Sequence, residues 1–239
     1  MNNIYDKIFW KILNDCRRLI LPVINEVFRE EYTGDEEIQF FPNEYFSGRQ
    51  DKDKEYITNI NFIVFGKTKK KYYIKRESNF PDERIAIRLS QTEADKSRII
   101  EETLTVKFPN TVLLYLWADK KAPDKMKYVI KTPGGTVKYD IPVIKVQAYS
   151  LDDIFKKRLL LFIPFYILSH EKNLSENSSS DQKLKELNSE YQIIIEKLDE
   201  LEQQGVIGVS DKKTIIDSSD DVMKEIAQKW NSDNIKIEA

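Results

Sequence analysis

Residues 56–77 read YITNINFIVFGKTKKKYYIKRE, and this stretch decides the fold. The segments 56–65 and 71–77 are rich in β-branched and aromatic residues, which favour strands because their side chains pack well on a pleated surface. The sequence GKTK at 66–69 separates them and has the composition of a turn. We therefore expect these residues to form a β-hairpin.

Other segments add strands to this hairpin. Residues 111–117 form a continuous apolar run of strand length, typical of a central strand covered on both faces. A Pro-Gly-Gly turn at 133–135 predicts a second hairpin between 126–131 and 136–146. The aromatic segment 37–49 contains a proline, and we expect it to be extended or irregular.

Helices are predicted around these strands. The apolar spacing within 5–28 fits a helix, with Pro22 marking a break between two pieces. A proline followed by acidic residues opens the segment 81–100, and both features are preferred in the first turn of a helix. Ser150 begins an approximate capping signature for an apolar helix that ends at Leu168.

The chain is expected to hold two domains. The polar, serine-rich segment 173–181 is the best boundary, so we assign 1–172 to an α/β domain and 181–239 to a C-terminal helical hairpin. We expect this hairpin to pack on the body or on itself, and a homodimer or partner contact through it is the alternative. Its first helix is coiled-coil-like, with an apolar stripe of Leu184, Leu187, Tyr191, Ile194, Leu198 and Leu201.

Composition narrows the classes of function. The chain has 239 residues and a net charge of −2, from 38 basic and 40 acidic residues, so bulk attraction to nucleic acid is excluded and any such binding must be local. Cys16 is the only cysteine, which excludes an intramolecular disulfide and a multi-cysteine zinc site and indicates a reducing compartment. His170, the only histidine, is expected at a helix end or on the surface.

No secretory signal or membrane span is expected. The N-terminus is polar, without an apolar run followed by a small-residue cleavage pattern. The most apolar window, 159–168, has about half of the ~20 residues that a membrane-spanning helix needs. These features predict a cytoplasmic protein with no membrane partner.

The hairpin of residues 56–77 also has the spacing of a metal-dependent nuclease site. Such enzymes carry an acid near the end of one strand and a second acid two residues before a lysine or polar residue on the next. Residues i and i+2 of a strand share a face, so these groups converge on one Mg²⁺ and the attacked phosphate. The corresponding stretches here are ITNINF at 57–62 and YYIKRES at 72–78.

These two stretches resemble the bacterial PD-(D/E)XK nuclease family transposases, which are related to the recombination-promoting nucleases. The likeness spans nearly the whole chain and is most specific in its PGG and FIPF segments. Further stretches that carry it are 24–28, 32–34, 43–44, 103–110, 123–126, 132–137, 141–143, 161–167 and 213–217. The resemblance implies a restriction-endonuclease-like mixed sheet flanked by helices for residues 1–172, and Mg²⁺-dependent DNA cleavage linked to transposition or recombination.

The departures from the family pattern fall where catalysis requires acids. By motif position, Asn59 replaces the family aspartate, Lys75 the glutamate and Glu77 the glutamine. An amide supplies no negative charge, and a lysine occupies a ligand's place, so we expect no Mg²⁺ site and no other cofactor. Gln91-Thr92 likewise stand where the family carries an acidic–aromatic pair.

A rearranged catalytic site is the alternative. Lys75 and Glu77 share a strand face, so the acid and the lysine have been exchanged rather than both lost, and Glu26 or Asp82 would add a ligand. The protein would then be an active Mg²⁺-dependent DNA endonuclease. A third interpretation makes Lys75 and Glu77 salt-bridge partners on a solvated face, with Asn59 a turn residue.

Basic residues surround this site in the sequence. Six of the ten residues in 67–76 are basic and two are tyrosines, a composition suited to gripping phosphates, although lysines also keep an exposed turn or edge soluble. The candidate nucleic-acid ligands are Lys67, Lys69, Lys70, Lys71 and Arg76. The acidic runs 29–37 and 217–221 are expected to be solvated faces, or mimics of nucleic acid for a protein partner.

The sequence therefore predicts a catalytically degenerate nuclease-like protein rather than an enzyme. It is expected to act by binding nucleic acid or a protein partner, for example as an inhibitor or regulator of a nuclease or defence complex.

Overall fold

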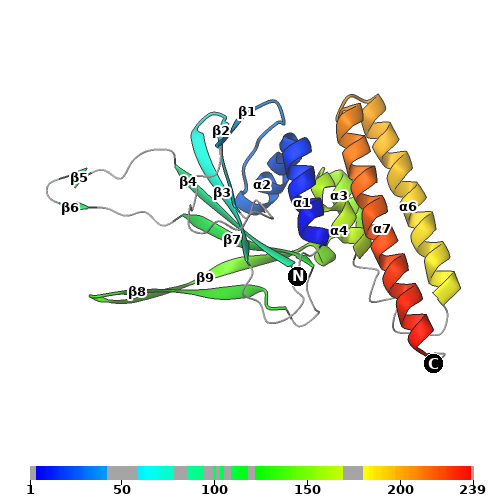
Figure 1. Ribbon diagram of the computed structural model, residues 1–239. Helices are drawn as coiled ribbons and strands as arrows, with labels where there is room; N and C mark the ends of the chain where they lie inside the picture. Colours follow the sequence, from blue (N-terminus) through cyan, green and yellow to red (C-terminus); the bar gives the residue numbers. More distant parts are fainter. Residues whose placement is uncertain are drawn as a thin grey trace, which may run out of the picture. The chain divides into compact units, whose positions relative to one another are not determined.

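The computed structural model divides the chain into two compact units (Figure 1). Residues 24–145 form a sheet unit, and the segments 1–23 and 146–239 together form a helical unit. The predicted boundary between 172 and 181 is therefore not where the two units divide. The residues that the structure describes are 4–41, 59–77, 85–93, 99–100, 103–104, 109–117, 122–168 and 180–237.

The sheet unit contains a mixed seven-stranded sheet with the strand order β1-β2-β3-β4-β7-β9-β8. Neighbouring strands are antiparallel except β7 and β9, which run parallel. With the helices of the other unit, this sheet confirms the expected α/β class. The strands are β1 (Glu37–Phe41), β2 (Asn59–Phe65), β3 (Lys69–Glu77), β4 (Ile85–Glu93), β7 (Asn110–Trp117), β8 (Lys125–Thr132) and β9 (Gly135–Lys145), with a separate pair of β5 (Ile99–Ile100) and β6 (Thr103–Leu104).

Both predicted hairpins are confirmed. β2 pairs with β3 without a register shift, and β8 pairs with β9 across the Pro-Gly-Gly turn. A side chain at Gly66 in the first turn would place its Cβ 3.0 Å from the ring of Tyr32, so glycine fits best at this position. β7 lies between β4 and β9, and its residues from Val112 to Trp117 are buried, as its apolar run predicts.

The helix expected over residues 81–100 is wrong. β4 (Ile85–Glu93) lies within this segment and pairs with both β3 and β7. Among its buried residues, Ile87, Leu89 and Gln91 alternate along the chain, which is the period of a strand, and Ser90 between them is 8% exposed. This alternation outweighs the helix-like composition at the start of the segment, where residues 81–84 lie outside the described part.

The helices of the chain begin before the sheet and resume after it. The break expected at Pro22 falls at Cys16, and Pro22 lies in the first turn of α2, where backbone N–H groups lack intrahelical partners. The helical segments are α1 (Ile4–Asp15), η1 (Arg17–Leu19), α2 (Ile20–Phe28), η2 (Val146–Ala148), α3 (Leu151–Lys156), η3 (Leu160–Phe162), α4 (Ile163–Leu168), α6 (Ser180–Gln203) and α7 (Val209–Ile237).

The apolar helix expected after Ser150 is divided into two. Its capping box is confirmed, since Ser150 accepts from the Asp153 amide and the Asp153 carboxylate accepts from Ser150. The Ser150 side chain also holds the pKa of Asp153 below its usual range. Arg158 has a φ of 56°, a left-handed conformation that ends α3, and α4 resumes only at Ile163.

The two C-terminal helices pack on the rest of the helical unit. α7 contacts α1 and α4 as well as α6, and Leu187, Ile194 and Leu198 of the predicted stripe are buried. Gly205 turns the chain between the helices with a φ of 71°. A coiled coil and a homodimer stay predictions. None of the described helices has the length and apolar character needed to cross a membrane.

Candidate functional site

β3 presents alternate residues to two different faces of the sheet. Tyr72 and Ile74 are 1% and 0% exposed, whereas Lys71 and Tyr73 are partly exposed and Lys75 is exposed. We call the side of the sheet that bears Tyr72 the closed face, and the side that bears Lys71 the open face. The two faces have different chemistry.

The closed face carries a row of side chains that crosses five strands. The register places Phe40, Phe62, Tyr72, Gln91 and Asn110 directly opposite one another, from β1 to β7. The rings of Phe40, Phe62 and Tyr72 stack, with centroids 5.0 and 5.3 Å apart. The row continues through hydrogen bonds: Gln91 Nε2 donates to the Tyr72 hydroxyl (3.0 Å), and Asn110 Nδ2 donates to Gln91 Oε1 (3.4 Å).

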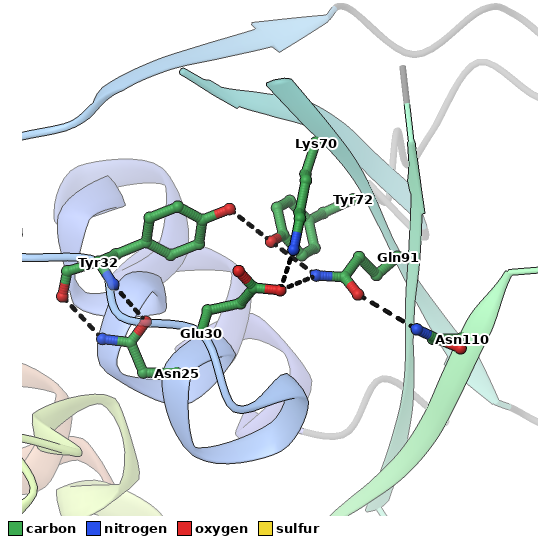
Figure 2. A network of polar contacts seen from close by, with 7 residues as sticks. All are labelled: Asn25, Glu30, Tyr32, Lys70, Tyr72, Gln91 and Asn110. Atoms are coloured by element: carbon green, nitrogen blue, oxygen red, sulfur yellow. Dashed lines mark hydrogen bonds and ion pairs between the residues drawn. The ribbon is translucent and has the colours of Figure 1, made fainter. Parts of the chain in front are cut away.

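Glu30 joins this row from the segment that follows α2 (Figure 2). It forms an ion pair with Lys70 and accepts a hydrogen bond from Gln91 Nε2 at 2.7 Å. The side chains of Glu30 and Lys70 are only 16% and 25% exposed. The expectation that Glu30 belongs to a solvated acidic face is therefore wrong, because this carboxylate is engaged with the sheet.

Tyr32 secures the same segment to the closed face (Figure 2). Its hydroxyl lies 2.7 Å from that of Tyr72, and the Asn25 side chain both donates to its carbonyl and accepts from its amide, at 2.8 and 2.9 Å. Burial raises the pKa of both tyrosines above their ordinary range. The polar groups of this network bond to one another. The network therefore fixes the segment after α2 to the sheet, which is a structural role.

The open face pairs lysines with aromatic rings. Lys69 Nζ lies 4.9 Å from the centroid of the Phe65 ring. Lys71 Nζ lies 4.9 Å from the Tyr73 ring and 5.8 Å from the Phe41 ring. These distances are within the range of cation–π attraction, so the rings hold the ammonium groups over the sheet.

The same chemistry continues on β4 and β8. Arg88 lies directly opposite Lys75, and its guanidinium carbon is 6.0 Å from the centroid of the Tyr128 ring. A sequence-based search misses Arg88 because its segment has the composition of a helix start. We call the whole surface the cation–aromatic face; it consists of Phe41, Phe65, Lys69, Lys71, Tyr73, Lys75, Arg88 and Tyr128.

The predicted catalytic positions lie at the end of the β2–β3 pair. Asn59 is directly opposite Lys75, and Glu77 is opposite Ala86. The six residue steps from Lys69 to Lys75 span about 20 Å of strand. The lysines nearest the turn are therefore not beside the predicted catalytic positions, contrary to expectation.

Several predicted residues can be placed only in part. Arg76 and Glu77 lie in β3, Glu26 lies in α2 and Lys67 is exposed in the turn after β2. The side chains of Arg76 and Glu77, like that of Asn59, lie outside the described part of the structure. Two more predicted residues, Asp82 and His170, lie outside it entirely.

The residue types at the predicted catalytic positions do not fit a Mg²⁺ site. Hard divalent cations take anionic oxygen ligands, and Lys75 instead brings an ammonium group opposite Asn59. Within the described residues, no group of three or more His, Cys, Asp or Glu is arranged to hold a metal ion.

Comparisons of the chain with family models, with curated proteins and with solved structures give no match. The architecture defines the class of protein as α/β with a seven-stranded mixed sheet. The resemblance to the PD-(D/E)XK family transposases stays a prediction from the sequence.

Proposed function

We propose that this protein binds nucleic acid on its cation–aromatic face and does not cleave it. The observation that carries the proposal is the alternation of β3, which gives Lys69, Lys71 and Lys75 to one face and keeps Lys70 and Tyr72 on the other. The open face thus gathers cations in a chain whose net charge is −2.

Both parts of a nucleic-acid chain have a matching group on this face. Lysine and arginine neutralise phosphates and release the counterions condensed on them, which favours binding whatever the base sequence. Aromatic rings on an open sheet stack with unpaired bases, and Tyr73 and Phe41 lie between the cations. Among the described residues of β1, β2 and β3, the acidic positions on this side of the sheet are Glu37 on β1 and Glu77 on β3, which stand at its two ends.

The proposal includes descent from a nuclease-like protein with a degenerate site. In support, the register puts position 59 opposite position 75, as the convergence of the family motif requires, and the residues there are an amide and a lysine. The sheet departs from the expected arrangement at β4, where the proline and acidic residues at the start of the segment lead us to expect a helix.

A titration with short single-stranded DNA and RNA tests the binding. We expect Lys69→Ala/Lys71→Ala to weaken binding uniformly across sequences and to reduce the salt slope by about 2, one for each phosphate contact. Lys70→Ala is the matched control, since its side chain belongs to the closed face, and it should leave the slope unchanged. If the unmodified protein binds no nucleic acid at low salt, the proposal fails and a protein partner takes its place.

A cleavage assay tests the degenerate site. The unmodified protein is incubated with supercoiled DNA, single-stranded DNA and RNA in Mg²⁺ or Mn²⁺, beside the variant Asn59→Asp/Lys75→Glu/Glu77→Gln, which restores the family residues. We expect no cutting by the unmodified protein, and cutting by the restored variant would support the ancestry. Cutting by the unmodified protein that is lost in EDTA and in Glu77→Ala would show an active, rearranged endonuclease.

A further inference from the structure

The hairpin of β8 and β9 extends well beyond the sheet. β9 pairs with β7 only from Val143 to Lys145, whereas β8 pairs with β9 over eight residue pairs, from Lys125–Pro142 to Thr132–Gly135. We call residues 125–142 the arm. Eight pairs correspond to a ribbon about 27 Å long, which Figure 1 shows as a two-stranded projection.

One side of the arm is apolar and anchors its base. Tyr128 and Tyr139 pack against each other with ring centroids 5.2 Å apart. Nearer the tip, Ile130 and Val137 continue this side as a cross-strand pair, and Val137 is 58% exposed. The base packs on the sheet through Met126, Tyr128, Tyr139 and Val143 against a cluster of Leu113, Tyr115, Ala122 and Ile141.

The other side of the arm is cationic. It presents exposed lysines at positions that alternate along both strands, with Asp140 opposite Lys127 as the acid on this side. Four lysines and one aspartate leave a net charge of +3 over the eight pairs. The lysines are Lys125, Lys127, Lys131 and Lys138.

Two-stranded ribbons are rarely stable alone in water, so a long one that projects from a sheet needs an anchored base. Lysines at a sheet edge also prevent edge-to-edge aggregation. Here, however, four of them gather on one side of a ribbon, which gives that side a positive field along its whole length. A partner that complements this field is a narrow, regular surface of negative charge.

We propose that the arm enters the major groove of duplex DNA, with its lysine side toward the phosphates that border the groove. The major groove of B-form DNA, about 12 Å wide, admits a two-stranded ribbon. The major groove of duplex RNA is deep and narrow and excludes one, so duplex DNA is the expected ligand. This inference rests on the proposed function and adds a second class of substrate to it.

Binding of the full-length protein to duplex DNA, duplex RNA and single-stranded DNA tests the arm. For Lys127→Ala/Lys131→Ala/Lys138→Ala we expect weaker binding to duplex DNA, with a salt slope lower by about 3, and unchanged binding to single strands. Lys69→Ala/Lys71→Ala should show the reverse pattern. Thr136→Ala, on the lysine side of the arm but uncharged, is the matched control and should leave both unchanged.

A labelled arm gives a readout that does not depend on the lysine variants. Val129→Cys places a thiol on the lysine side, and the natural Cys16 is buried, so a thiol-reactive fluorophore marks the arm. Duplex DNA should shield the fluorophore from a soluble quencher, and single-stranded DNA should not.

Each result decides between the two proposals. Loss of duplex binding in the arm variant, together with shielding of the label, supports the proposal that the arm binds duplex DNA. The proposal for the arm is overturned if the arm variant binds duplex DNA with the same salt slope, or if the protein binds duplex RNA more tightly than duplex DNA. Either result leaves the proposal for the cation–aromatic face standing. No binding of any nucleic acid by the unmodified protein overturns both.

Discussion

Lys70 and Lys71 are neighbours in sequence, yet they belong to opposite faces of the sheet. Lys70 lies on the closed face in an ion pair with Glu30, and Lys71 lies on the open face beside the rings of Tyr73 and Phe41. The same division separates Tyr72 from Tyr73. A basic run in a strand is therefore not one patch, because a period of two sends half of it to each side.

The largest difference between the faces should appear in the core. Phe62 is 0% exposed and stacks between Phe40 and Tyr72, so Phe62→Ala should lower the free energy of unfolding by about 3–5 kcal/mol. Urea denaturation measures this change. Phe65→Ala, on the open face, is the matched control and should cost clearly less, since Phe65 is only partly buried. Equal costs for the two would contradict the division.

The neighbouring tyrosines give a finer comparison. Tyr72→Phe removes a buried hydroxyl that contacts Gln91 and Tyr32, and should lower the free energy of unfolding by about 1–3 kcal/mol. Tyr73→Phe should change it by less than about 0.5 kcal/mol, as is usual for a surface position. A reversal of this order in chemical denaturation would mean that the closed face is not the structural one.

The adjacent lysines should divide stability from binding. Lys70→Ala breaks the ion pair with Glu30 and leaves that carboxylate only its hydrogen bond from Gln91. We expect this to destabilise the fold by about 1–2 kcal/mol. Lys71→Ala should leave stability within about 0.5 kcal/mol and weaken nucleic-acid binding instead. Denaturation and binding measured on the same two proteins test this, and loss of both properties in one variant would argue against separate roles.

The smallest effect is a dependence of stability on alkaline pH. Burial, together with the Tyr32 hydroxyl, raises the pKa of Tyr72 in the folded protein above that of an unfolded chain, which is about 10. The stabilisation of the fold by the protonated Tyr72 hydroxyl is therefore complete below the unfolded pKa and is lost as the pH rises above that value. The stability difference between the unmodified protein and Tyr72→Phe should shrink between pH 8 and pH 11. A difference that grows over this range would mean that folding lowers the pKa of Tyr72 instead of raising it.

Local patterns in the sequence predict much of this fold. The hairpins, the buried strand β7 and the capping box at Ser150 each depend on residues close together in the chain, and each is confirmed. β4 was missed because the helix-like composition of residues 81–84 competes with the alternation of Ile87, Leu89 and Gln91. Pairing with β3 and β7 favours the strand over the helix, and a short stretch of sequence around β4 does not contain those partners.

The candidate site is less predictable for the same reason. The register of β2 and β3 follows from the hairpin, so the meeting of positions 59 and 75 could be expected. The contacts of Glu30 with Lys70 and Gln91 join residues 40 and 61 positions apart, and nothing in their own surroundings marks them. Alternation along β3 places Lys70 on the opposite face from Lys69 and Lys71. This could be used only if the bounds of the strand and the side of the sheet that is covered were already known.

The helical unit is discontinuous in sequence, and this has a consequence for how the protein is made. The residues of the sheet unit leave the ribosome as one block and can pair as they emerge. α1 has to wait, because its buried residues Phe9 and Ile12 belong to a unit completed by α4 and α7. At synthesis rates of about 5–20 residues per second, that interval is roughly 10–40 s. During it, the apolar residues of α1 lack their partners from α4 and α7, and exposed apolar surface of this kind makes a nascent chain prone to aggregation.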